Sequence, residues 1–148
     1  MQRVLFVCTG NTCRSPMAAA ILKNQNIPEV EVKSAGIYAV NGGEASEQAK
    51  QVLAENNIEH HHQSTALTGN EVGWATLILT MTAAHKAAIL ERFPEAAEKT
   101  LTLKEYVGEK DPFDVADPFG GNVERYRTTF RQLEELIQAA IDRLKSSS

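Results

Sequence analysis

A cysteine and an arginine stand six residues apart near the N-terminus, in the stretch VLFVCTGNTCRSPMAAAIL. Cys8 ends an apolar run, and Arg14 follows a short segment of small and polar residues. A thiolate is a nucleophile that can attack phosphorus, and the planar fork of a guanidinium can hold two oxygens of a phosphoryl group. The pair therefore suggests phosphoryl transfer through cysteine.

The strand and helix predicted on either side of Cys8 and Arg14 would place both side chains where phosphoryl transfer could occur. Residues 3–7 read as a buried strand, and residues 15–25 read as a helix with Pro16 in its first turn, where a missing N–H does no harm. A strand-to-helix turn lies at the carboxyl end of a parallel sheet, where ligands bind. Its backbone N–H groups, together with the helix dipole, would form an anion nest that also stabilises the Cys8 thiolate. The loop residues expected to bind substrate are Thr9, Gly10, Asn11, Thr12, Cys13 and Ser15.

A plainer interpretation makes Cys8 a buried cysteine at a strand end and Arg14 a surface cation. The spacing alone does not separate the two interpretations. The strand before the loop, the Gly and Asn within it, and the Ser-Pro and helix after it favour the functional one, with Ser15 placed at the helix N-cap to donate to the thiolate. A nucleotide P-loop is excluded at this turn because the Gly-Lys-Ser/Thr ending is missing.

The remainder of the chain alternates strand and helix patterns, which predicts an α/β fold with a parallel sheet. The predicted strands are residues 3–7, 30–34, 76–81 and 100–103, and the predicted helices are 15–25, 44–56, 83–92 and 123–144. The last helix carries one apolar stripe that we expect to pack on the sheet. That stripe consists of Val123, Tyr126, Phe130, Leu133, Ile137, Ile141 and Leu144. No linker divides the chain, so we expect a single domain over residues 1–148.

Composition narrows the class of protein. The chain has 148 residues, of which 43% are hydrophobic and 23% charged, and a net charge of -4. The net charge argues against general nucleic-acid binding. No apolar run is long enough to span a bilayer, and the N-terminus lacks signal-peptide features. We therefore expect a cytoplasmic, monomeric protein whose two cysteines, Cys8 and Cys13, are reduced thiols.

The motif VCTGNTCRSPMA resembles the phosphate-binding loop of the low-molecular-weight protein tyrosine phosphatase family. The resemblance continues through SAG at residues 34–36, LT at 67–68, LILTM at 77–81 and DPFGG at 117–121. It implies a three-layer, flavodoxin-like fold with a four-stranded parallel sheet. It also implies catalysis without metal or cofactor through a cysteinyl-phosphate intermediate, on phosphorylated protein substrates.

By this resemblance Cys8 is the nucleophile, Arg14 is the phosphate clamp and Ser15 tunes the thiolate. Asn11, Ser34 and His62 match positions whose hydrogen bonds support the loop; Asn11 also reads as a turn residue that tolerates positive φ. His62 ends an HHH run, but three consecutive imidazoles do not converge on one ion, so we expect no metal site.

One departure from the family follows the loop. Ala19 stands where the family usually has Glu, and we expect it to face solvent.

The proton donor for the leaving group is expected in DPFDVADPFGG, which contains Asp-Pro-Phe twice. Only Asp117 directly precedes the Gly-Gly turn into the last helix, and only it matches the family's general acid. Asp111 reads as a turn residue. Asp114 either perturbs Asp117 by its like charge or lies in solvent.

Two positions bear on the substrate. Tyrosine-directed members of the family usually have a branched aliphatic residue at the place of Thr12 and tyrosines after the Asp-Pro, where this chain has Phe119 and Gly120. The pattern resembles the protein arginine phosphatase branch, in which the threonine discriminates substrates. A hydroxyl offers a guanidinium a polar partner. Phe119 either stacks on that guanidinium or belongs to the core. The sequence therefore favours phosphoarginine, with phosphotyrosine as the alternative.

Two alternative functions could use the same loop: arsenate reduction and thiol redox sensing. Arsenate reductases of the same fold need further cysteines, and this chain has none beyond Cys13. A thiol redox sensor would use Cys8 and Cys13, which lie five residues apart and could close a disulfide after oxidation. Our hypothesis is that this oxidation is a reversible off-switch, with Cys13 as the redox partner of the catalytic thiol.

Overall fold

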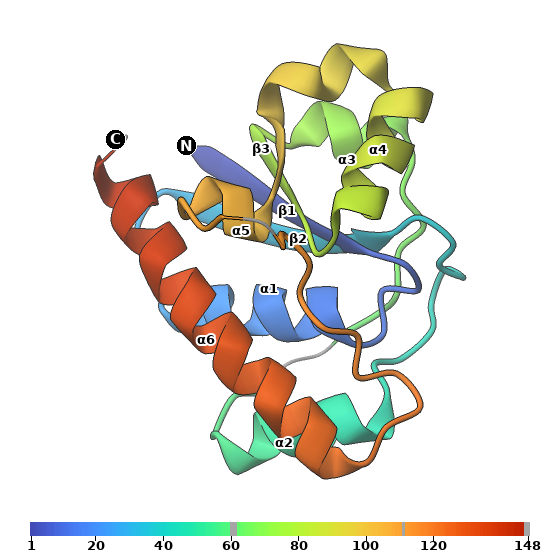
Figure 1. Ribbon diagram of the computed structural model, residues 1–148, viewed down its shortest axis with the longest axis vertical. Helices are drawn as coiled ribbons and strands as arrows, with labels where there is room; N and C mark the ends of the chain where they lie inside the picture. Colours follow the sequence, from blue (N-terminus) through green and yellow to red (C-terminus); the bar gives the residue numbers. More distant parts are fainter. Residues whose placement is uncertain (60–61, 111, 147–148) are drawn as a thin grey trace.

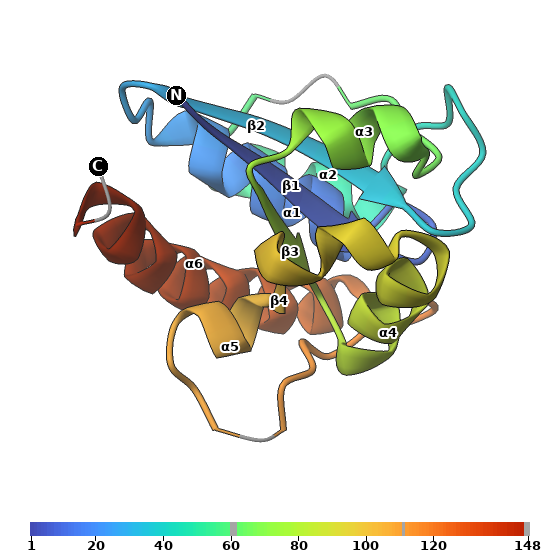
Figure 2. The ribbon, with the colours of Figure 1, turned by 90° about the horizontal axis from the view of Figure 1, so that it is seen from above.

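The computed structural model describes residues 1–59, 62–110 and 112–146. Its centre is a parallel sheet of four strands in the order β2-β1-β3-β4 (Figures 1 and 2). The strands are β1 (Gln2–Cys8), β2 (Val30–Gly36), β3 (Leu77–Thr80) and β4 (Thr100–Thr102). The predicted α/β class and the four-stranded parallel sheet are confirmed.

Strand β1 lies between β2 and β3 and is buried on both faces. Its side chains alternate, so that Phe6 and Cys8 join the hydrophobic cluster of one face while Leu5 and Val7 join the cluster of the other. A continuous apolar run is what a parallel strand covered on both faces requires. Cys8 is the last residue of this run and of β1, so it lies at the carboxyl edge of the sheet.

Helices cover both faces of the sheet (Figure 1). One face carries α1 (Arg14–Asn24), α2 (Glu47–Glu55) and α6 (Val123–Ser146). The other face carries α3 (Gly69–Trp74) and α4 (Ala83–Arg92), followed by the 3-10 turn η1 (Pro94–Lys99). The short helix α5 (Leu103–Tyr106) follows β4. Among the described residues, none of the helices is both long and apolar enough to cross a membrane.

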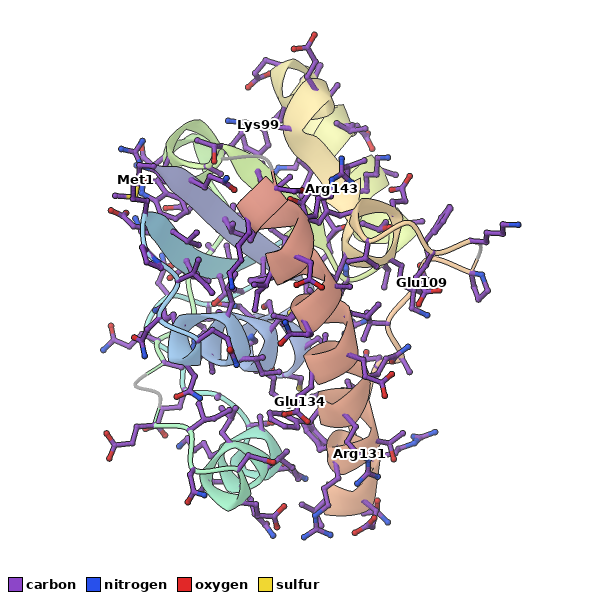
Figure 3. All side chains as sticks on the ribbon, turned by 90° about the vertical axis from the view of Figure 1, so that its left-hand side faces the viewer. Met1, Lys99, Glu109, Arg131, Glu134 and Arg143 are labelled. Atoms are coloured by element: carbon purple, nitrogen blue, oxygen red, sulfur yellow. The ribbon has the colours of Figure 1, made fainter. Side chains whose placement is uncertain are left out.

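Helix α6 buries the stripe that the sequence predicted, except that Val123 is only partly buried. The stripe joins the hydrophobic cluster that contains Val4 and Phe6 of β1 and Leu79 of β3, as expected for packing on this face of the sheet, and α6 also lies against α1 and α2. Its polar side chains, such as Arg131 and Glu134, project into solvent (Figure 3).

The buried environment of α1 also overturns the expectation for Ala19, which is 1% exposed. Helix α1 packs on β1 and β2 as well as on α2 and α6, so the part of it that bears Ala19 has no solvent face.

The apolar pattern of the sequence did not predict the short helices α3 and α5, because neither is long enough to show a helical period. Both begin at a capping box, formed by Thr68 with Glu71 at α3 and by Thr102 with Glu105 at α5. The second box explains why the strand predicted over residues 100–103 ends one residue earlier. Thr102 caps α5, so Leu103 is already helical.

Candidate active site

The loops that follow β1 and β2 and the segment before α6 meet at the carboxyl edge of the sheet, on the right-hand side of Figure 1. The backbone after β2 is bound to the loop after β1, with Ile37 donating to the Cys8 carbonyl at 3.0 Å and Tyr38 donating to the Thr9 carbonyl at 2.9 Å. Gly36 permits this approach, because a Cβ there would lie 2.6 Å from the Thr9 carbonyl oxygen. The loop at residues 9–13 is therefore held from the β2 side.

Asn11 is the internal support of the loop. It is fully buried and has a φ of 57°, the left-handed conformation that Asn tolerates. Its Oδ1 accepts from the Thr65 backbone N–H at 2.9 Å, and its Nδ2 donates to Ser15 Oγ at 2.8 Å. Both ends of the amide are satisfied, which fixes its orientation.

The Asn11 carbonyl is held from the opposite side of the loop. His62 Nε2 donates to it at 2.6 Å, and Ser64 Oγ donates to it at 3.0 Å. Burial lowers the pKa of His62, although the bond to this carbonyl opposes the shift and Lys23 adds to it. His60 and His61, the other members of the HHH run, lie outside the described residues.

Ser34 lies elsewhere, on β2 opposite Phe6. Among the described residues, its hydroxyl makes no hydrogen bond to the loop. Ser64, which carried no motif in the sequence, contacts the loop instead.

Cys8 and Ser15 face each other, with 2.9 Å between Sγ and Oγ. The sequence placed Ser15 at the helix N-cap, and that placement is wrong: the N-cap is Cys13, and Ser15 lies inside the first turn. Because Asn11 donates to the Ser15 oxygen, the Ser15 hydroxyl hydrogen is available to a thiolate at Cys8, which has no hydrogen of its own to donate. The helix N-terminus adds its dipole at the same place.

Arg14 is buried, with 5% of its surface exposed. Its Nη1 donates to the Val115 carbonyl at 3.0 Å, and its Nη2 lies 3.6 Å from Asp117 Oδ2. The segment before α6 is thus attached to the loop after β1 through one guanidinium.

Asp114, which is exposed, makes a second attachment of this segment. Its Oδ1 accepts from the Ala83 backbone N–H at 2.8 Å, at the start of α4. Next to it, the Val115 N–H donates to the Met81 carbonyl at 2.8 Å. These bonds fix the chain just before Asp117. Asp111 lies outside the described residues.

A cavity of about 270 Å³ opens between the loop and Asp117. Phe119 forms part of its rim and is 73% exposed, so it does not belong to the core. The Phe119 N–H also donates to Asp117 Oδ1 at 3.0 Å, which orients the carboxylate. The cavity is lined by Cys8, Thr9, Gly10, Thr12, Cys13, Arg14, Asp117 and Phe119. A thiol, a guanidinium and a carboxylate therefore line the same cavity.

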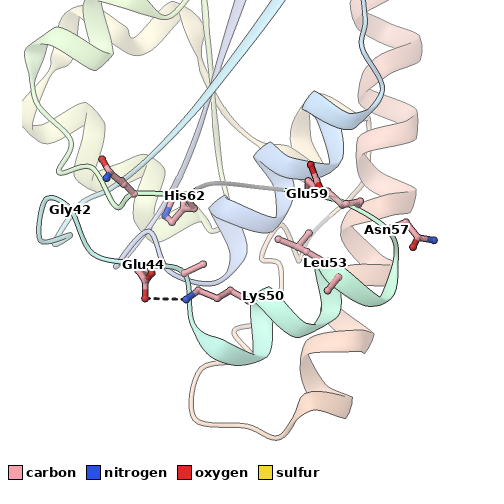
Figure 4. A pocket seen from close by; sticks show the side chains of 11 residues that line it. Gly42, Glu44, Lys50, Leu53, Asn57, Glu59 and His62 are labelled. Carbon is pink, nitrogen blue, oxygen red and sulfur yellow. Dashed lines mark hydrogen bonds and ion pairs between the residues drawn. The ribbon is translucent and has the colours of Figure 1, made fainter.

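A larger cavity of about 1030 Å³ lies beside α2 (Figure 4). Its wall includes Leu53, Glu59 and the ion pair of Lys50 with Glu44. Among the lining residues that the structure describes, His62 is the one with a hydrogen bond to residues 9–13 of the loop after β1. It contains neither the thiol nor the guanidinium, so we place the chemistry in the smaller cavity.

Cys13 lines the smaller cavity and also contacts α6 and the residue before α2. Its Sγ lies 3.1 Å from the Tyr126 hydroxyl and 3.8 Å from Ser46 Oγ, while the Ser46 N–H donates to the Thr12 carbonyl at 2.9 Å. Burial, followed by the bond to Cys13, raises the pKa of Tyr126 to about 12. Sequence reasoning assigned Tyr126 to the core only and missed Ser46.

Within the described ranges, His, Cys, Asp and Glu side chains form no group of three or more that is placed to hold a metal ion.

Comparisons with known proteins identify relatives of this chain. The model of the family described as low molecular weight phosphotyrosine protein phosphatase matches residues 3–148. A protein-arginine-phosphatase of Geobacillus stearothermophilus is 55% identical over 144 residues, which cover 97% of each chain. The solved structure of the YwlE arginine phosphatase from Geobacillus stearothermophilus has a TM-score of 0.97 at 54% identity and covers 99% of this chain and 95% of its own. A structure of a YwlE arginine phosphatase mutant with a phosphorylated active-site serine has a TM-score of 0.92 at 41% identity, over 97% of this chain and 96% of its own.

Proposed function

This chain belongs to the low molecular weight phosphotyrosine protein phosphatase family, and we propose that it is a protein arginine phosphatase acting on phosphorylated proteins. The observation that carries the proposal is the cavity in which Cys8, Arg14 and Asp117 converge beside Thr12. Because the nucleophile must be a reduced thiol, we place the enzyme in the cytoplasm, and we expect it to act as a monomer.

In the first step the Cys8 thiolate attacks the phosphorus of phosphoarginine, and an S–P bond forms as the P–N bond breaks. Arg14 and the backbone N–H groups of the loop hold the phosphoryl oxygens. The electron pair of the broken bond stays on the guanidine nitrogen, which takes a proton from the Asp117 carboxyl group. Ser15 stabilises the thiolate before the attack, across the 2.9 Å contact described above.

In the second step a water molecule attacks the phosphorus of the cysteinyl phosphate. Asp117, now a carboxylate, takes a proton from that water. The S–P bond breaks, its electrons return to Cys8 as a thiolate, and inorganic phosphate leaves. The cycle closes without an outside donor of protons or electrons, and Cys8, Arg14 and Asp117 all line the same cavity.

The preference for arginine is proposed to arise from Thr12 and Phe119, which lie on the wall and rim of the cavity. The Thr12 hydroxyl supplies a polar partner for the guanidinium. The exposed ring of Phe119 supplies a face on which a planar cation can stack. A branched aliphatic side chain at position 12 would leave the guanidinium without its polar partner while packing well on a phenyl ring.

Replacing Thr12 with Ile is therefore expected to lower the ratio of kcat/KM for phosphoarginine to that for phosphotyrosine by about 10- to 100-fold. Phosphate release from the two substrates should be measured side by side on the wild type and the variant. Thr128→Ile is the matched control, because Thr128 is an exposed threonine on α6 remote from the cavity lining. A wild type that prefers phosphotyrosine would overturn the arginine assignment and leave a tyrosine phosphatase.

We also propose that Cys13 is the redox partner of Cys8. Peroxide would oxidise the Cys8 thiolate to a sulfenic acid, and the Cys13 thiolate would attack that sulfur to form an S–S bond with loss of the hydroxyl oxygen as water. Both thiols are free and buried in the structure.

After peroxide treatment, the intact mass should fall by two hydrogens and phosphatase activity should return on reduction. Cys13→Ser should instead be over-oxidised without recovery. If peptide mapping of the treated wild type reveals no bond between Cys8 and Cys13, this role of Cys13 is wrong.

A further inference from the structure

His85 on α4 touches the phosphate loop but has no part in the chemistry proposed above. It is buried, with 8% of its surface exposed, and its Nε2 lies 2.8 Å from the Thr9 hydroxyl oxygen. Its Nδ1 is the one buried side-chain polar atom among the described residues that lacks a hydrogen-bond partner. Buried polar atoms are normally paired, so an unpaired one that persists next to an active site calls for a functional explanation.

The turn of chain that carries His85 also holds the segment that bears the proposed acid. The Ala83 N–H binds Asp114, and the Met81 carbonyl binds the Val115 N–H. The first turn of α4 and the end of β3 thus contact both halves of the cavity: the loop through His85 and the acid segment through Asp114 and Val115. The relative position of the nucleophile and the acid depends on these contacts.

The charge state of His85 fits a hydrogen-bonding role. Its pKa is lowered to about 4, first by burial and then by the positive charge of Arg14, while Asp114 and Asp117 oppose the shift. At neutral pH the imidazole is therefore uncharged and adds no repulsion beside Arg14. It acts on Thr9 through hydrogen-bond geometry alone.

We propose that His85 is a positioning residue that holds the phosphate loop, through Thr9, at a fixed distance from the segment carrying Asp117. The inference deepens the proposed function, since it concerns the same cavity, and it rests on that function. His85 contacts neither the thiol nor the arginine by any hydrogen bond in the described structure, so its effect passes through Thr9.

The tautomer of His85 follows from the unpaired nitrogen. If Nδ1 carried the proton, a buried N–H donor would be left without a partner, whereas an unprotonated Nδ1 leaves only an unused acceptor, which proteins tolerate better. The proton therefore lies on Nε2, which donates to the Thr9 oxygen. The Thr9 hydroxyl hydrogen then remains available for a phosphoryl oxygen in the cavity that Thr9 lines.

The test compares His85→Ala with His85→Gln, whose amide nitrogen can reach about as far as Nε2 and donate in its place. The probes are p-nitrophenyl phosphate as substrate and inorganic phosphate as competitive inhibitor. His85→Ala should weaken phosphate inhibition and lower kcat, each by about three- to tenfold, and His85→Gln should restore most of both. Lys86→Ala is the control, because Lys86 is the next residue on α4 but pairs with Glu105, away from the loop.

Two further measurements keep the inference falsifiable if His85→Ala fails to fold. Thr9→Val removes the partner hydroxyl from an exposed position, and its effect should not add to that of His85→Leu, which fills the space of the imidazole without a donor, since both act through one hydrogen bond. Nitrogen NMR of the wild type should find Nε2 protonated and Nδ1 unprotonated at neutral pH.

The outcomes separate this inference from the proposed function. A wild type that hydrolyses neither p-nitrophenyl phosphate nor phosphoarginine would refute the function itself. An active wild type with unchanged phosphate inhibition and kcat in folded His85→Ala, or with strictly additive effects of Thr9→Val and His85→Leu, would refute the positioning role alone.

Discussion

Replacing Cys8 with serine is expected to abolish turnover, with a loss on the order of 10,000-fold or more, and to leave the protein phosphorylated at the new hydroxyl. The Cys8→Ser side chain would still point toward Ser15 and the anion nest. Its oxygen can form a bond to phosphorus, but an alkoxide is a far poorer leaving group than a thiolate. The first step would therefore occur slowly and the second would stall.

Intact mass spectrometry after incubation with phosphoarginine should detect one added phosphoryl group on Cys8→Ser. The related arginine phosphatase mutant with a phosphorylated active-site serine supports this expectation. Cys8→Ala is the matched control, because it keeps the loop and Arg14 but has no nucleophile and should stay unmodified. Turnover by folded Cys8→Ala at the wild-type rate would remove Cys8 from the mechanism.

Replacing Asp117 with asparagine is expected to lower kcat for phosphoarginine by about 100- to 10,000-fold, because the departing guanidine nitrogen loses its proton donor. Asparagine has nearly the shape of aspartate, and its amide oxygen can still accept from the Phe119 N–H. The cavity should therefore keep its form. The contact of Arg14 with position 117 loses its ionic character.

Two substrates with different leaving groups can distinguish a proton-donating role of Asp117 from a positioning role. p-Nitrophenyl phosphate releases a stable anion that needs little protonation, so Asp117→Asn should slow its release from the enzyme much less than it slows the release of guanidine. Single-turnover measurements of the first step on both substrates provide the comparison, with Asp142→Asn, an exposed carboxylate on α6, as control. Equal losses on the two substrates would show that Asp117 acts by orienting Arg14 and not as the acid.

The sequence by itself determined the parts of the site that are close along the chain. The buried strand, the turn and the helix that carry Cys8 and Arg14 form one continuous segment, so backbone preference and apolar pattern suffice to place both side chains on one loop. The same local logic identified Asn11 as a turn residue that tolerates positive φ, and its φ is 57°. The Asp-Pro-Phe repeat likewise marked Asp117 through its position before the Gly-Gly turn.

Only the tertiary structure decided which distant residues support that segment. Ser64 and Thr65 bind Asn11, Val115 binds Arg14, and His85 binds Thr9, although no spacing in the sequence relates these partners. The error at Ala19 has the same origin, because α1 is buried by α6 and α2, which pack where no local pattern could place them. Local conformation depends on neighbouring residues, whereas burial and hydrogen-bond partners depend on where the whole chain has packed.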